Sequence, residues 1–554
     1  MDRIIFAFVI VFLLLPIPGK AVVDMKNANY ATTWTDMVVP GTGYDLKISR
    51  TYNSRSLFNG MFGFGWCSDF ETSLDITPEG NLKIKECGGG MEVLYSPREI
   101  AKADIETTIG KIVEGMKSDP KALKKSEDIA NLKKKLLTDD GERSELAQKY
   151  GIKVKIKEGT KFFANGREVE YFVYDQSKKT YSRYLPDSTK QIFNLDGKMV
   201  QMSDKNNNYL VFTYDKGSLS EVKDNNNRKL QFKYFPTKKV YSITGPGGLK
   251  ADYEFSNIDL LSSARDAWQK TYKYQYDKSY NLTLITWPDK STVKLDYDEK
   301  NDWVMGFKDR DNCQENYTYE FEGKDESHYW STVKKVCGKE VVANNRYEFW
   351  YKNRADGKPF LSRVRTEING DSTDISYDDV FGKPLSISRN QQRTSFEYYP
   401  NGLVKKKATS NAMIEFTYQT DSKKVSKVVT TFFNEKNKPM NVATTSFKYD
   451  VKGNLNYAEN SLGQKISVLH DARGRIVEIK DQAKKVVKVS YEEKFGKPSV
   501  ISRPGLGTIT FKYKSNGDID KTESKEGPTV LTQVASAFNN FLDVIAPATD
   551  EIYL

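Results

Sequence analysis

Histidine, cysteine and proline are scarce in this chain of 554 residues, which contains 2, 4 and 18 of them. The two histidines, His328 and His470, are far apart in the sequence, and there is no Cys-x-x-Cys pair, so a zinc site is not predicted. Nucleophile-elbow, HExxH, phosphate-loop and dinucleotide-binding motifs are also missing. We therefore expect a non-enzymatic protein with no catalytic residues, no bound metal and no cofactor.

Long apolar runs are missing after the first residues of the chain. A short charged start precedes an apolar run from Ile4 to about Ile17, and the small residues Gly19 and Ala21 follow. This pattern is typical of a secretory signal peptide, residues 1–21, and the run is short for a membrane span. An uncleaved anchor is the alternative. We expect export to the periplasm, the cell surface or the extracellular space, with no membrane span after cleavage.

The four cysteines lie in two close pairs, Cys67 with Cys87 and Cys313 with Cys337. In an oxidising compartment an even number of cysteines favours disulfides, and four cysteines allow three pairings. We predict the local pairing, in which each disulfide closes one or two hairpins.

The net charge is +11, and removal of residues 1–21, which carry a net +1, leaves about +10. Such a chain is attracted to anionic surface polymers, so an anionic glycan or an envelope protein is a candidate partner. The lysines alternate with apolar residues, which also fits a solvated outer face. Nothing in the sequence indicates nucleic-acid binding.

Aromatic residues, in contrast, are plentiful, with 33 Tyr and 29 Phe. Tyr, Phe, Val and Thr favour strands, and the mean hydropathy of -0.63 fits strands with one solvated face. At about 150 residues per domain the length suggests three or four domains, unless repeats share one core.

Two adjacent segments, GKMVQMSDKNNNYLVFTYD at 197–215 and GSLSEVKDNNNRKLQFKYF at 217–235, repeat at a spacing of 20 residues. In the first, Leu210, Phe212 and Tyr214 alternate with polar residues, which predicts one face of a strand. Asp204 and the asparagines after it predict a turn. One unit is therefore a β-hairpin of about 20 residues, whose apolar face needs neighbouring units.

Tyrosines recur at the end of these units, mostly at intervals near 21 residues. We interpret as repeat anchors Tyr214, Tyr234, Tyr276, Tyr297, Tyr377, Tyr398, Tyr418, Tyr449, Tyr491 and Tyr513. His470 occupies the tyrosine position of its unit, so we expect a strand residue beside a turn rather than a catalytic base.

Residues 97–151 differ from this pattern and predict a helical insertion. Ile105, Ile109 and Ile112 recur at helical spacing, as do Leu123, Ile129, Leu132 and Leu136. Ser96-Pro97-Arg98-Glu99 resembles a capping box, and Asp119-Pro120 predicts the start of a second helix. A short third helix is expected to end at Gly151.

The repeats resemble the YD, or RHS, repeats of bacterial Rhs proteins, Tc-toxin B/C shells and animal teneurins. Tyr-Asp occurs at residues 214, 276, 297, 377 and 449. Residues 38–70 resemble the opening module of Rhs proteins. Its motifs are present as Arg50 to Ser54, Gly60, Phe62, Gly63, Gly65 and Trp66. Residues 180–204, TYSRYLPDSTKQIFNLDGKMVQMSD, resemble the lead-in to the first repeats.

This resemblance implies hairpins laid side by side in a spiralling sheet that curls into a hollow shell. In large relatives the shell encloses a C-terminal toxin domain, which an aspartyl autoprotease at the end of the repeats releases. Here no paired D-P-x-G-type motif occurs near the C-terminus, and about 370 residues of repeats are fewer than in the large shells. We therefore expect a small or partly open curved or barrel-like sheet without self-cleavage.

The expected organisation is a signal peptide at 1–21, an opening β module at 22–96, the helical insertion at 97–151, the repeat shell at 152–526, and a C-terminal helix and tail at 527–554. Leu531, Val534, Phe538 and Leu542 form a helical stripe in the last segment. That helix is expected to cap the shell or to dock in a groove of another protein.

Two main hypotheses of function follow. The first is an exported shell or scaffold that binds a cell-surface glycan or a protein partner. The alternative is a reduced Rhs-type shell or chaperone that delivers a separately encoded toxin. A glycan hydrolase is a third class, although no pair of carboxylates has the spacing of a general acid and base.

Overall fold

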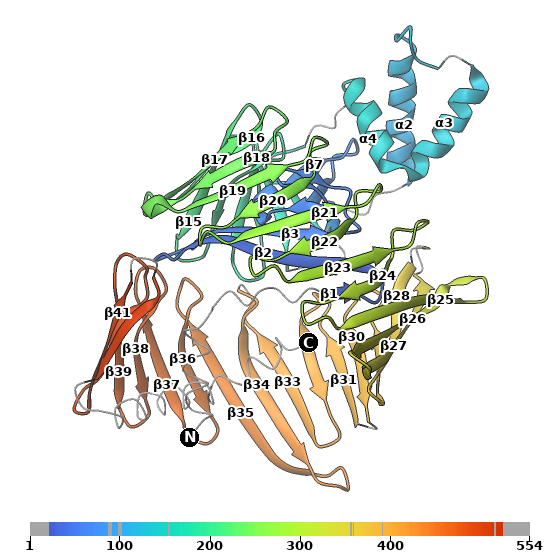
Figure 1. The fold of residues 1–554 in the computed structure, drawn as a ribbon. Coiled ribbons are helices and arrows are strands. Elements are labelled where there is room, and N and C mark those ends of the chain that lie inside the picture. Colours follow the sequence, from blue (N-terminus) through green and yellow to red (C-terminus); the bar gives the residue numbers. More distant parts are fainter. Residues whose placement is uncertain are drawn as a thin grey trace. The chain divides into compact units, whose positions relative to one another are not determined.

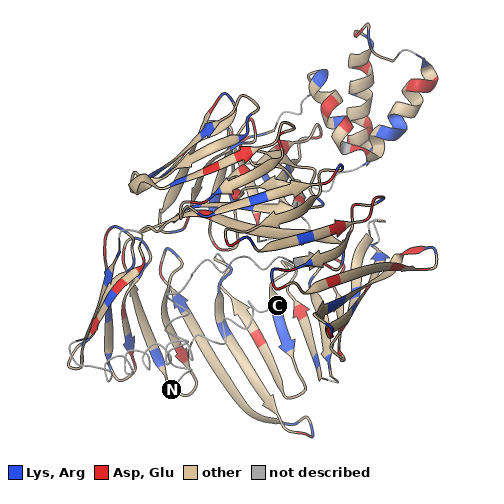
Figure 2. Cartoon of the chain, viewed as in Figure 1, with Lys and Arg blue, Asp and Glu red and all other residues tan. Residues whose placement is uncertain are grey.

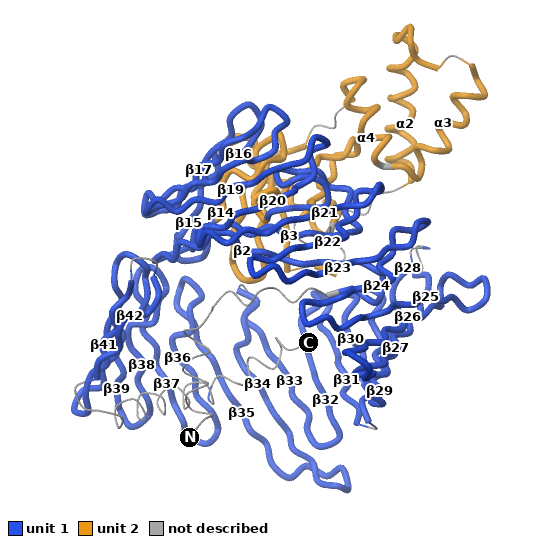
Figure 3. The backbone as a smooth tube through the Cα atoms, in the orientation of Figure 1, with its two compact units in different colours: residues 1–68, 203–554 blue, residues 69–202 orange. Residues whose placement is uncertain are grey.

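The computed structural model describes residues 22–86, 91–97, 102–123, 125–152, 156–164, 166–167, 169–354, 357, 359–390, 392–420, 422–514, 517–524 and 544. The predicted signal peptide, Cys87 and nearly all of the predicted C-terminal helix lie outside these residues. The chain divides into two compact units, residues 1–68 with 203–554 and residues 69–202 (Figure 3). Residues 22–68 of the predicted opening module belong to the first unit and residues 69–96 to the second.

Antiparallel pairing of consecutive strands dominates the fold and confirms the predicted mainly β architecture of hairpins. In the described residues β10 to β42 form a 33-stranded sheet in which every strand pairs with the next one in the chain. The order has two ends, so the sheet is open rather than a closed barrel.

Unit 2 combines three short sheet strands, three helices and the first strands of the large sheet. Its elements are η1 (Asp69–Glu71), β7 (Ser73–Ile76), β8 (Leu82–Glu86), β9 (Met91–Tyr95), α2 (Lys102–Met116), α3 (Ser126–Thr138), α4 (Asp140–Lys149), β10 (Lys161–Phe163), β11 (Tyr171–Asp175), β12 (Thr180–Tyr184), β13 (Lys190–Asn194) and β14 (Met199–Ser203). Arg183, 2% exposed, joins the strands by ion pairs with Glu86 and Glu170. Such a buried cation must be paired, because desolvation is costly.

The three helices fall within the predicted insertion, but the second begins at Ser126 and not at Pro120. Asp119 instead starts a turn, since its main-chain carbonyl accepts from the Ala122 N–H at 3.1 Å and its side chain from the Lys121 N–H at 2.9 Å. Leu123 is consequently outside the helix and 47% exposed. Ile109, Ile112, Met116 and Leu136 form the buried core between the helices, as their helical spacing predicts.

Unit 1 begins with β1 (Val22–Asp24), β2 (Asn29–Val39), β3 (Leu46–Asn53), β4 (Asn59–Gly60), β5 (Gly63–Phe64) and β6 (Trp66–Cys67). β2 and β3 are long antiparallel strands with alternating buried side chains. The face of these strands packs against early strands of the repeat sheet (Figure 1).

The repeat strands of unit 1 follow in two groups. The first group comprises β15 (Tyr209–Asp215), β16 (Ser218–Asp224), β17 (Lys229–Tyr234), β18 (Val240–Thr244), β19 (Lys250–Phe255), β20 (Leu261–Arg265), β21 (Thr271–Tyr276), β22 (Leu282–Thr286), β23 (Thr292–Tyr297), β24 (Val304–Lys308), β25 (Gln314–Glu322), β26 (Asp325–Cys337), β27 (Glu340–Asn353) and β28 (Pro359–Ile368). A short 3-10 turn, η2 (Pro246–Gly248), joins β18 and β19.

The second group comprises β29 (Asp371–Tyr377), β30 (Pro384–Arg389), β31 (Gln392–Tyr398), β32 (Val404–Ala408), β33 (Ala412–Tyr418), β34 (Val425–Phe433), β35 (Pro439–Tyr449), β36 (Leu455–Asn460), β37 (Lys465–His470), β38 (Ile476–Asp481), β39 (Val486–Tyr491), β40 (Pro498–Arg503), β41 (Gly507–Tyr513) and β42 (Ile519–Ser524). Many of these strands bury alternate side chains, as β15 and β23 do, because strand side chains alternate between two faces. We call the face with the buried residues the inner face and the other the outer face.

The hairpin turns share one hydrogen-bond pattern, which explains their Asx residues. The Asp204 carboxylate accepts the N–H groups of Asn206 at 2.8 Å and Asn208 at 2.9 Å, and Asn207 has a φ of 63°. The same pattern recurs at Asp224, Asp266, Asp277, Asp309, Asp450 and Asp471. Asx side chains favour such turns because they bond to nearby main chain and tolerate positive φ.

The sheet of unit 1 bends so far that early and late turns meet. Lys205 donates to the Gly453 carbonyl at 2.8 Å, and the Asn454 side-chain amide donates to Asn206 Oδ1 at 3.1 Å. We call these contacts, together with those of loop 40–44 described below, the seam. Strands about twenty positions apart in the order of the sheet are therefore neighbours here.

Loop 40–44, between β2 and β3, also lies at this meeting point. Asn226 donates to Thr42 at 2.8 Å, and Arg228 donates to the carbonyls of Pro40 and Tyr44. Gly496, from the turn between β39 and β40, lies so close that a Cβ atom there would be 2.4 Å from Thr42 Cα. The opening loop therefore contacts both an early and a late repeat turn of unit 1.

Cys313 and Cys337 form a disulfide with a Cα–Cα distance of 4.3 Å. They are the next opposed pair after Gln314 and Val336 of β25 and β26. Closing a loop of this length stabilises a fold by about 3 kcal/mol in the chain-entropy treatment. Cys67 is also disulfide-bonded, and its predicted partner, Cys87, lies outside the described residues.

Two features concern the ends of the fold. Within the described part of the chain, no helix combines the length and apolar character needed to cross a membrane. Val544 is 1% exposed and packs among Val404, Phe416 and Phe447 on the inner face. One residue of the predicted C-terminal segment therefore lies in the core of the repeat sheet.

Candidate functional site

The opening-module motifs form a buried contact with the repeat strands of unit 1. Tyr52 of β3 accepts the main-chain N–H of Leu282 at 2.9 Å, and Trp66 Nε1 donates to the Tyr276 hydroxyl at 2.9 Å. Phe62 is fully buried and packs edge-on against Tyr253, with ring centroids 5.0 Å apart. The motif residues therefore fix β2–β6 to strands β19, β21 and β22.

A buried ion pair lies at the centre of this contact. Arg50 Nε donates to Asp36 Oδ2 at 2.7 Å, and both side chains are at most 1% exposed. Arg50 also donates to the Tyr274 hydroxyl at 2.7 Å, while the Tyr253 hydroxyl donates to Asp36 Oδ2 at 2.9 Å. The guanidinium lies over the rings of Trp34, Trp66 and Tyr274 at 5.3, 4.7 and 5.2 Å. Such stacking on aromatic rings compensates for lost hydration.

Burial and the neighbouring charges shift the pKa of three groups in this cluster, Arg50, Tyr253 and Tyr274. Burial alone would lower the pKa of Arg50, but Asp36 and Tyr274 raise it above its ordinary value. Burial raises the pKa of Tyr253 and Tyr274, and the Asp36 charge raises both further. Both tyrosines therefore remain neutral at physiological pH. The cluster joins β2 and β3 to the repeat strands β19 and β21.

The predicted repeat anchors all lie at or next to the end of a strand, at Tyr214, Tyr234, Tyr276, Tyr297, Tyr377, Tyr398, Tyr418, Tyr449, Tyr491 and Tyr513. Several hydroxyls donate to a main-chain carbonyl of the preceding strand. Tyr297 donates to Leu282 at 3.0 Å, Tyr491 to Ile476 at 2.7 Å and Tyr513 to Pro498 at 2.6 Å. Tyr234, Tyr398, Tyr418 and Tyr449 do the same. These residues connect hairpins and do not converge on one site.

The two histidines lie in different strands, His328 in β26 and His470 in β37. His470 ends β37 and pairs with Ile476, as expected for a residue at the tyrosine position. Burial lowers its pKa, although Asp450 opposes the shift. His328 stacks on Trp350 at 4.8 Å and contacts Glu348 Oε1 through Nε2 at 2.8 Å. In the described residues no His, Cys, Asp and Glu side chains are grouped to hold a metal ion.

The best candidate site lies on the inner face of β25–β27, where aromatic side chains gather. We call this set the tyrosine face, and it comprises Tyr317, Tyr319, Phe321, Tyr329, Tyr347, Phe349 and Tyr351. The N-terminal segment crosses it. Ser331 Oγ donates to the Met25 carbonyl and the Tyr329 hydroxyl to the Lys26 carbonyl, both at 2.6 Å.

One end of the tyrosine face forms a pocket of about 460 Å³. Tyr329 and Tyr351 line it with nearly parallel rings, 6.1 Å apart at 16°. Its other lining residues are Glu326, Ser327, Lys352, Asn353 and Pro359. Aromatic walls with a few polar groups are typical of small-molecule sites.

A second pocket of about 250 Å³ lies near the disulfide, between Val23, Met25 and the tyrosine face. Lys335 Nζ lies 3.0 Å from both Asp309 Oδ2 and Glu315 Oε1. Burial alone would lower the pKa of Lys335, but these carboxylates raise it, so the ammonium stays charged. Burial and the hydrogen bond to Glu315 raise the pKa of Tyr317. Lys335 and the two carboxylates are therefore paired with one another in this pocket.

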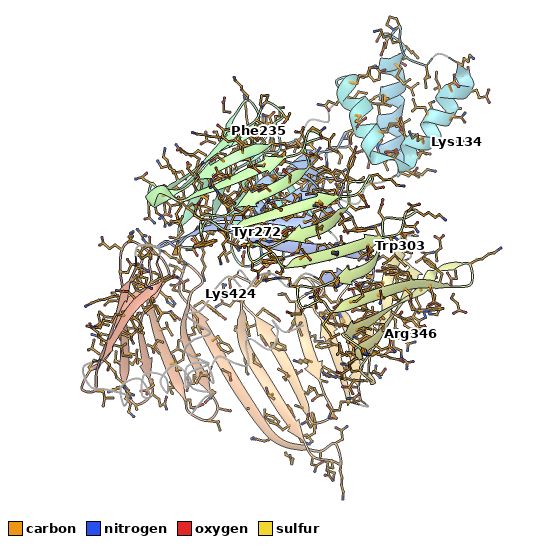
Figure 4. All side chains as sticks on the ribbon, in the orientation of Figure 1. Lys134, Phe235, Tyr272, Trp303, Arg346 and Lys424 are labelled. Atoms are coloured by element: carbon orange, nitrogen blue, oxygen red, sulfur yellow. A yellow bond between two sulfur atoms is a disulfide. The ribbon has the colours of Figure 1, made fainter. Side chains whose placement is uncertain are left out.

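The outer face of the same strands carries stacked side chains that satisfy one another. Trp350 lies between His328 and Arg363, at 4.8 and 4.6 Å. Arg346, labelled in Figure 4, covers Trp330 at 4.5 Å. These contacts leave less ring surface open for a ligand on the outer face.

Sequence reasoning missed the tyrosine face. Tyr319 is a further anchor, since its hydroxyl donates to the Val304 carbonyl at 2.8 Å. It lacks the Tyr-Asp dipeptide, and the long strands β25–β28 interrupt the repeat spacing. The alternation of aromatic residues in Tyr317, Tyr319 and Phe321 is the signal that could have found it.

Comparison with known proteins gives one family match. Residues 20–89 match the family described as a domain of unknown function, DUF6531. This range includes residues 38–70, which carry the resemblance to the Rhs opening module. A search of the curated proteins finds no match.

Several solved structures show a weak likeness. A crystal structure of TcdB2-TccC3-TEV gives a TM-score of 0.43 at 12% identity, covering 91% of this chain and 28% of that chain. A crystal structure of TcdB2-TccC3 without its hypervariable C-terminal region also gives a TM-score of 0.43 at 12% identity, covering 97% of this chain and 29% of that chain. The structure of the Photorhabdus luminescens Tc holotoxin pore gives a TM-score of 0.27 at 11% identity, covering 90% of this chain and 32% of that chain. A likeness of this size assigns no function. The chain carries a recognisable domain of unknown function at 20–89, and a hairpin-repeat sheet follows it.

Proposed function

We propose that the chain is an exported, non-enzymatic scaffold whose tyrosine face binds a glycan. The observation that carries the proposal is the pair of rings, Tyr329 and Tyr351, at the wall of the larger pocket. Sugar rings have apolar C–H faces and hydroxyl edges, so they suit aromatic walls beside polar groups. Glu326, Lys352 and Asn353 supply those polar groups.

The proposed absence of catalysis rests on how the ionisable groups are used. The recurring aspartates accept turn N–H groups, and Glu315 is held by Lys335 and Tyr317. A glycosidase needs two carboxylates that face a substrate across a defined gap. The groups that line the larger pocket include one carboxylate, Glu326.

The test is calorimetric titration of the full chain with cellotetraose, chitotetraose and maltotetraose. At least one tetrasaccharide should bind, and Tyr351→Ala should weaken that binding about tenfold, because one bounding ring is lost. Tyr241→Ala is the matched control, since Tyr241 is an exposed ring on β18 outside both pockets. Equal weakening by both variants would contradict the assignment to this pocket. Release of reducing ends during incubation would contradict the non-enzymatic proposal.

A second candidate function is a reduced shell or chaperone that holds a separately encoded effector. Val544 supports it, because the inner face buries a residue from a segment that is not a repeat. Co-expression of the full chain with the product of the adjacent gene tests it. A stable complex of defined stoichiometry would support the candidate, and separate elution of the two proteins would exclude it.

A further inference from the structure

Lysine lies directly opposite lysine at three places in the described strand registers. The pairs are Lys223 with Lys229, Lys294 with Lys308, and Lys512 with Lys521. Directly opposed like charges on neighbouring strands destabilise a sheet. Each pair therefore needs a compensating charge or carries a cost.

Two of the three pairs have a carboxylate beside them. Lys229 forms an ion pair with Glu221 at 2.9 Å. Lys512 and Lys521 share Glu523, at 3.3 and 2.8 Å. In the described residues Lys294 and Lys308 form no ion pair, unlike the lysines of the other two pairs.

Two further lysines extend this pair across the outer face. Lys273 lies on β21 and Lys334 on β26, each between inner-face residues, and neither forms an ion pair with a described residue. We call Lys273, Lys294, Lys308 and Lys334 the lysine stripe. Lys273 lies opposite Thr286, which pairs with Thr292, two residues before Lys294 on β23. Lys334 lies opposite Asn316, which pairs with Gly306, two residues before Lys308 on β24. Because Lys294 and Lys308 are opposed and their strands are antiparallel, Lys273 and Lys334 lie on opposite sides of this pair, and the stripe runs diagonally over the six strands β21–β26.

The surroundings of the stripe are mainly polar, although Leu284 lies directly opposite Lys294 and Val336 lies opposite Gln314. Thr286, Thr292, Gln314 and Asn316 lie between the lysines on the same face. Asp296 is the acidic residue among them, and it lies against Gly306. Charged residues along these strands are coloured in Figure 2. The stripe therefore keeps a positive excess.

We propose that the lysine stripe is a binding surface for a linear anionic polysaccharide. An anionic chain laid along the stripe would neutralise the repulsion between Lys294 and Lys308 and release counterions. The short polar side chains between the lysines can bond to sugar hydroxyls. Nucleic acid fits less well, because the stripe has no aromatic ring for base stacking and no groove-entering element. This surface is independent of the tyrosine face.

The test uses dextran sulfate as the probe and the double variant Lys294→Gln and Lys308→Gln. Binding should fall about fivefold or more in 0.1 M salt, and the slope of log affinity against log salt should decrease by about 1 to 2. The free energy of unfolding should stay equal or rise, because a repulsive pair is removed. Weaker binding in an equally stable protein separates a binding role from a structural one.

The matched control is Lys233→Gln with Lys480→Gln, which removes the same charge from exposed positions opposite Ser242 and Ser467. It should change the affinity by less than about twofold. Equal weakening in both double variants would overturn the proposal in favour of general charge attraction. Tighter binding of duplex DNA than of dextran sulfate would overturn the choice of polysaccharide. Tyr351→Ala should leave dextran sulfate binding intact, so this proposal and the proposed function fail separately.

Discussion

The tyrosine at the end of a repeat strand lies half in the core and half in solvent. Its ring packs with the buried residues, and its hydroxyl donates to the strand before it, as in Tyr491 and Ile476. The ring supplies apolar burial and the hydroxyl ties two hairpins together, so a phenylalanine would supply only the first. Phe255 occupies the corresponding position of β19, directly after a register shift. Because phenylalanine has no hydroxyl, this unit lacks the hydrogen bond to the preceding strand.

These hydroxyls predict a loss of stability at alkaline pH. Burial raises the pKa of Tyr398, Tyr491 and Tyr513 to about 12. The folded pKa lies above the unfolded value of about 10, so the stabilisation is complete below pH 10 and is lost as the pH rises through 12. Urea unfolding at pH 8, 10 and 11 should show the decrease. If tyrosinate absorbance of the folded chain titrated fully near pH 10, this expectation would be wrong.

Phe212 provides a test of the shared core at one position. It is 3% exposed on β15, and Phe212→Asp places a carboxylate among apolar side chains. The free energy of unfolding should fall by at least about 3 kcal/mol. Thr213→Asp is the control, because Thr213 is exposed on the outer face of the same strand. Equal thermal stability of the wild type and Phe212→Asp would remove Phe212 from the core.

At the scale of elements, unit 2 depends on a turn that tolerates no side chain. Gly197, between β13 and β14, has a φ of 73°, and its carbonyl accepts the Leu74 N–H at 2.8 Å. A Cβ atom there would lie 1.7 Å from the Leu74 carbonyl oxygen. The strand β7 therefore pairs closely with this turn only because the residue is glycine.

Gly197→Ala should destabilise unit 2 by more than about 2 kcal/mol, because it adds a main-chain clash to the cost of positive φ. Gly323→Ala measures the cost of positive φ alone, since Gly323 has a φ of 58° and open space around its Cβ position. That control should cost about 1 kcal/mol. Chemical denaturation of both variants measures the difference, and equal losses would show that Leu74 can move away.

The hairpin elements were predictable because alternation and Asx turns are local properties. The spacing of Leu210, Phe212 and Tyr214 indicates a strand, and β15 confirms it. The start of α3 was not predictable in the same way, because Asp119-Pro120 suits a turn as well as a helix start. The tyrosine face and the lysine stripe depend on register between strands, which hydrophobic period alone does not set.

For unit 1 as a whole, the seam holds early and late turns together. Loop 40–44 bonds to Asn226 and Arg228 on one side and contacts Gly496 on the other. These contacts are few and lie in turns, so we expect them to open more readily than the strand ladders. The seam is then the place where the curved sheet can spread without breaking a strand pair.

Gly496→Ala should open the seam selectively. Gly496 has a φ of 66° and no room for a side chain beside Thr42, whereas Gly505 has a φ of 80° and open space. Amide hydrogen exchange should become faster in residues 40–44 and 204–208 in Gly496→Ala, and should stay unchanged there in Gly505→Ala. Strand amides of β21–β23 should keep their protection in both. Unchanged exchange at 40–44 would mean that the late turns do not hold the loop.

The seam also constrains the order in which parts of the chain can fold. Loop 40–44 leaves the ribosome early, but Gly496 is made about 450 residues later, so their contact is of very high sequence separation. Hairpins can form one after another from the N-terminal end, whereas the junction must wait for the last repeats. In a truncated or stalled chain, loop 40–44 would lack its contacts with the late turns. The exposed loop would then be accessible to the cell's quality-control proteases.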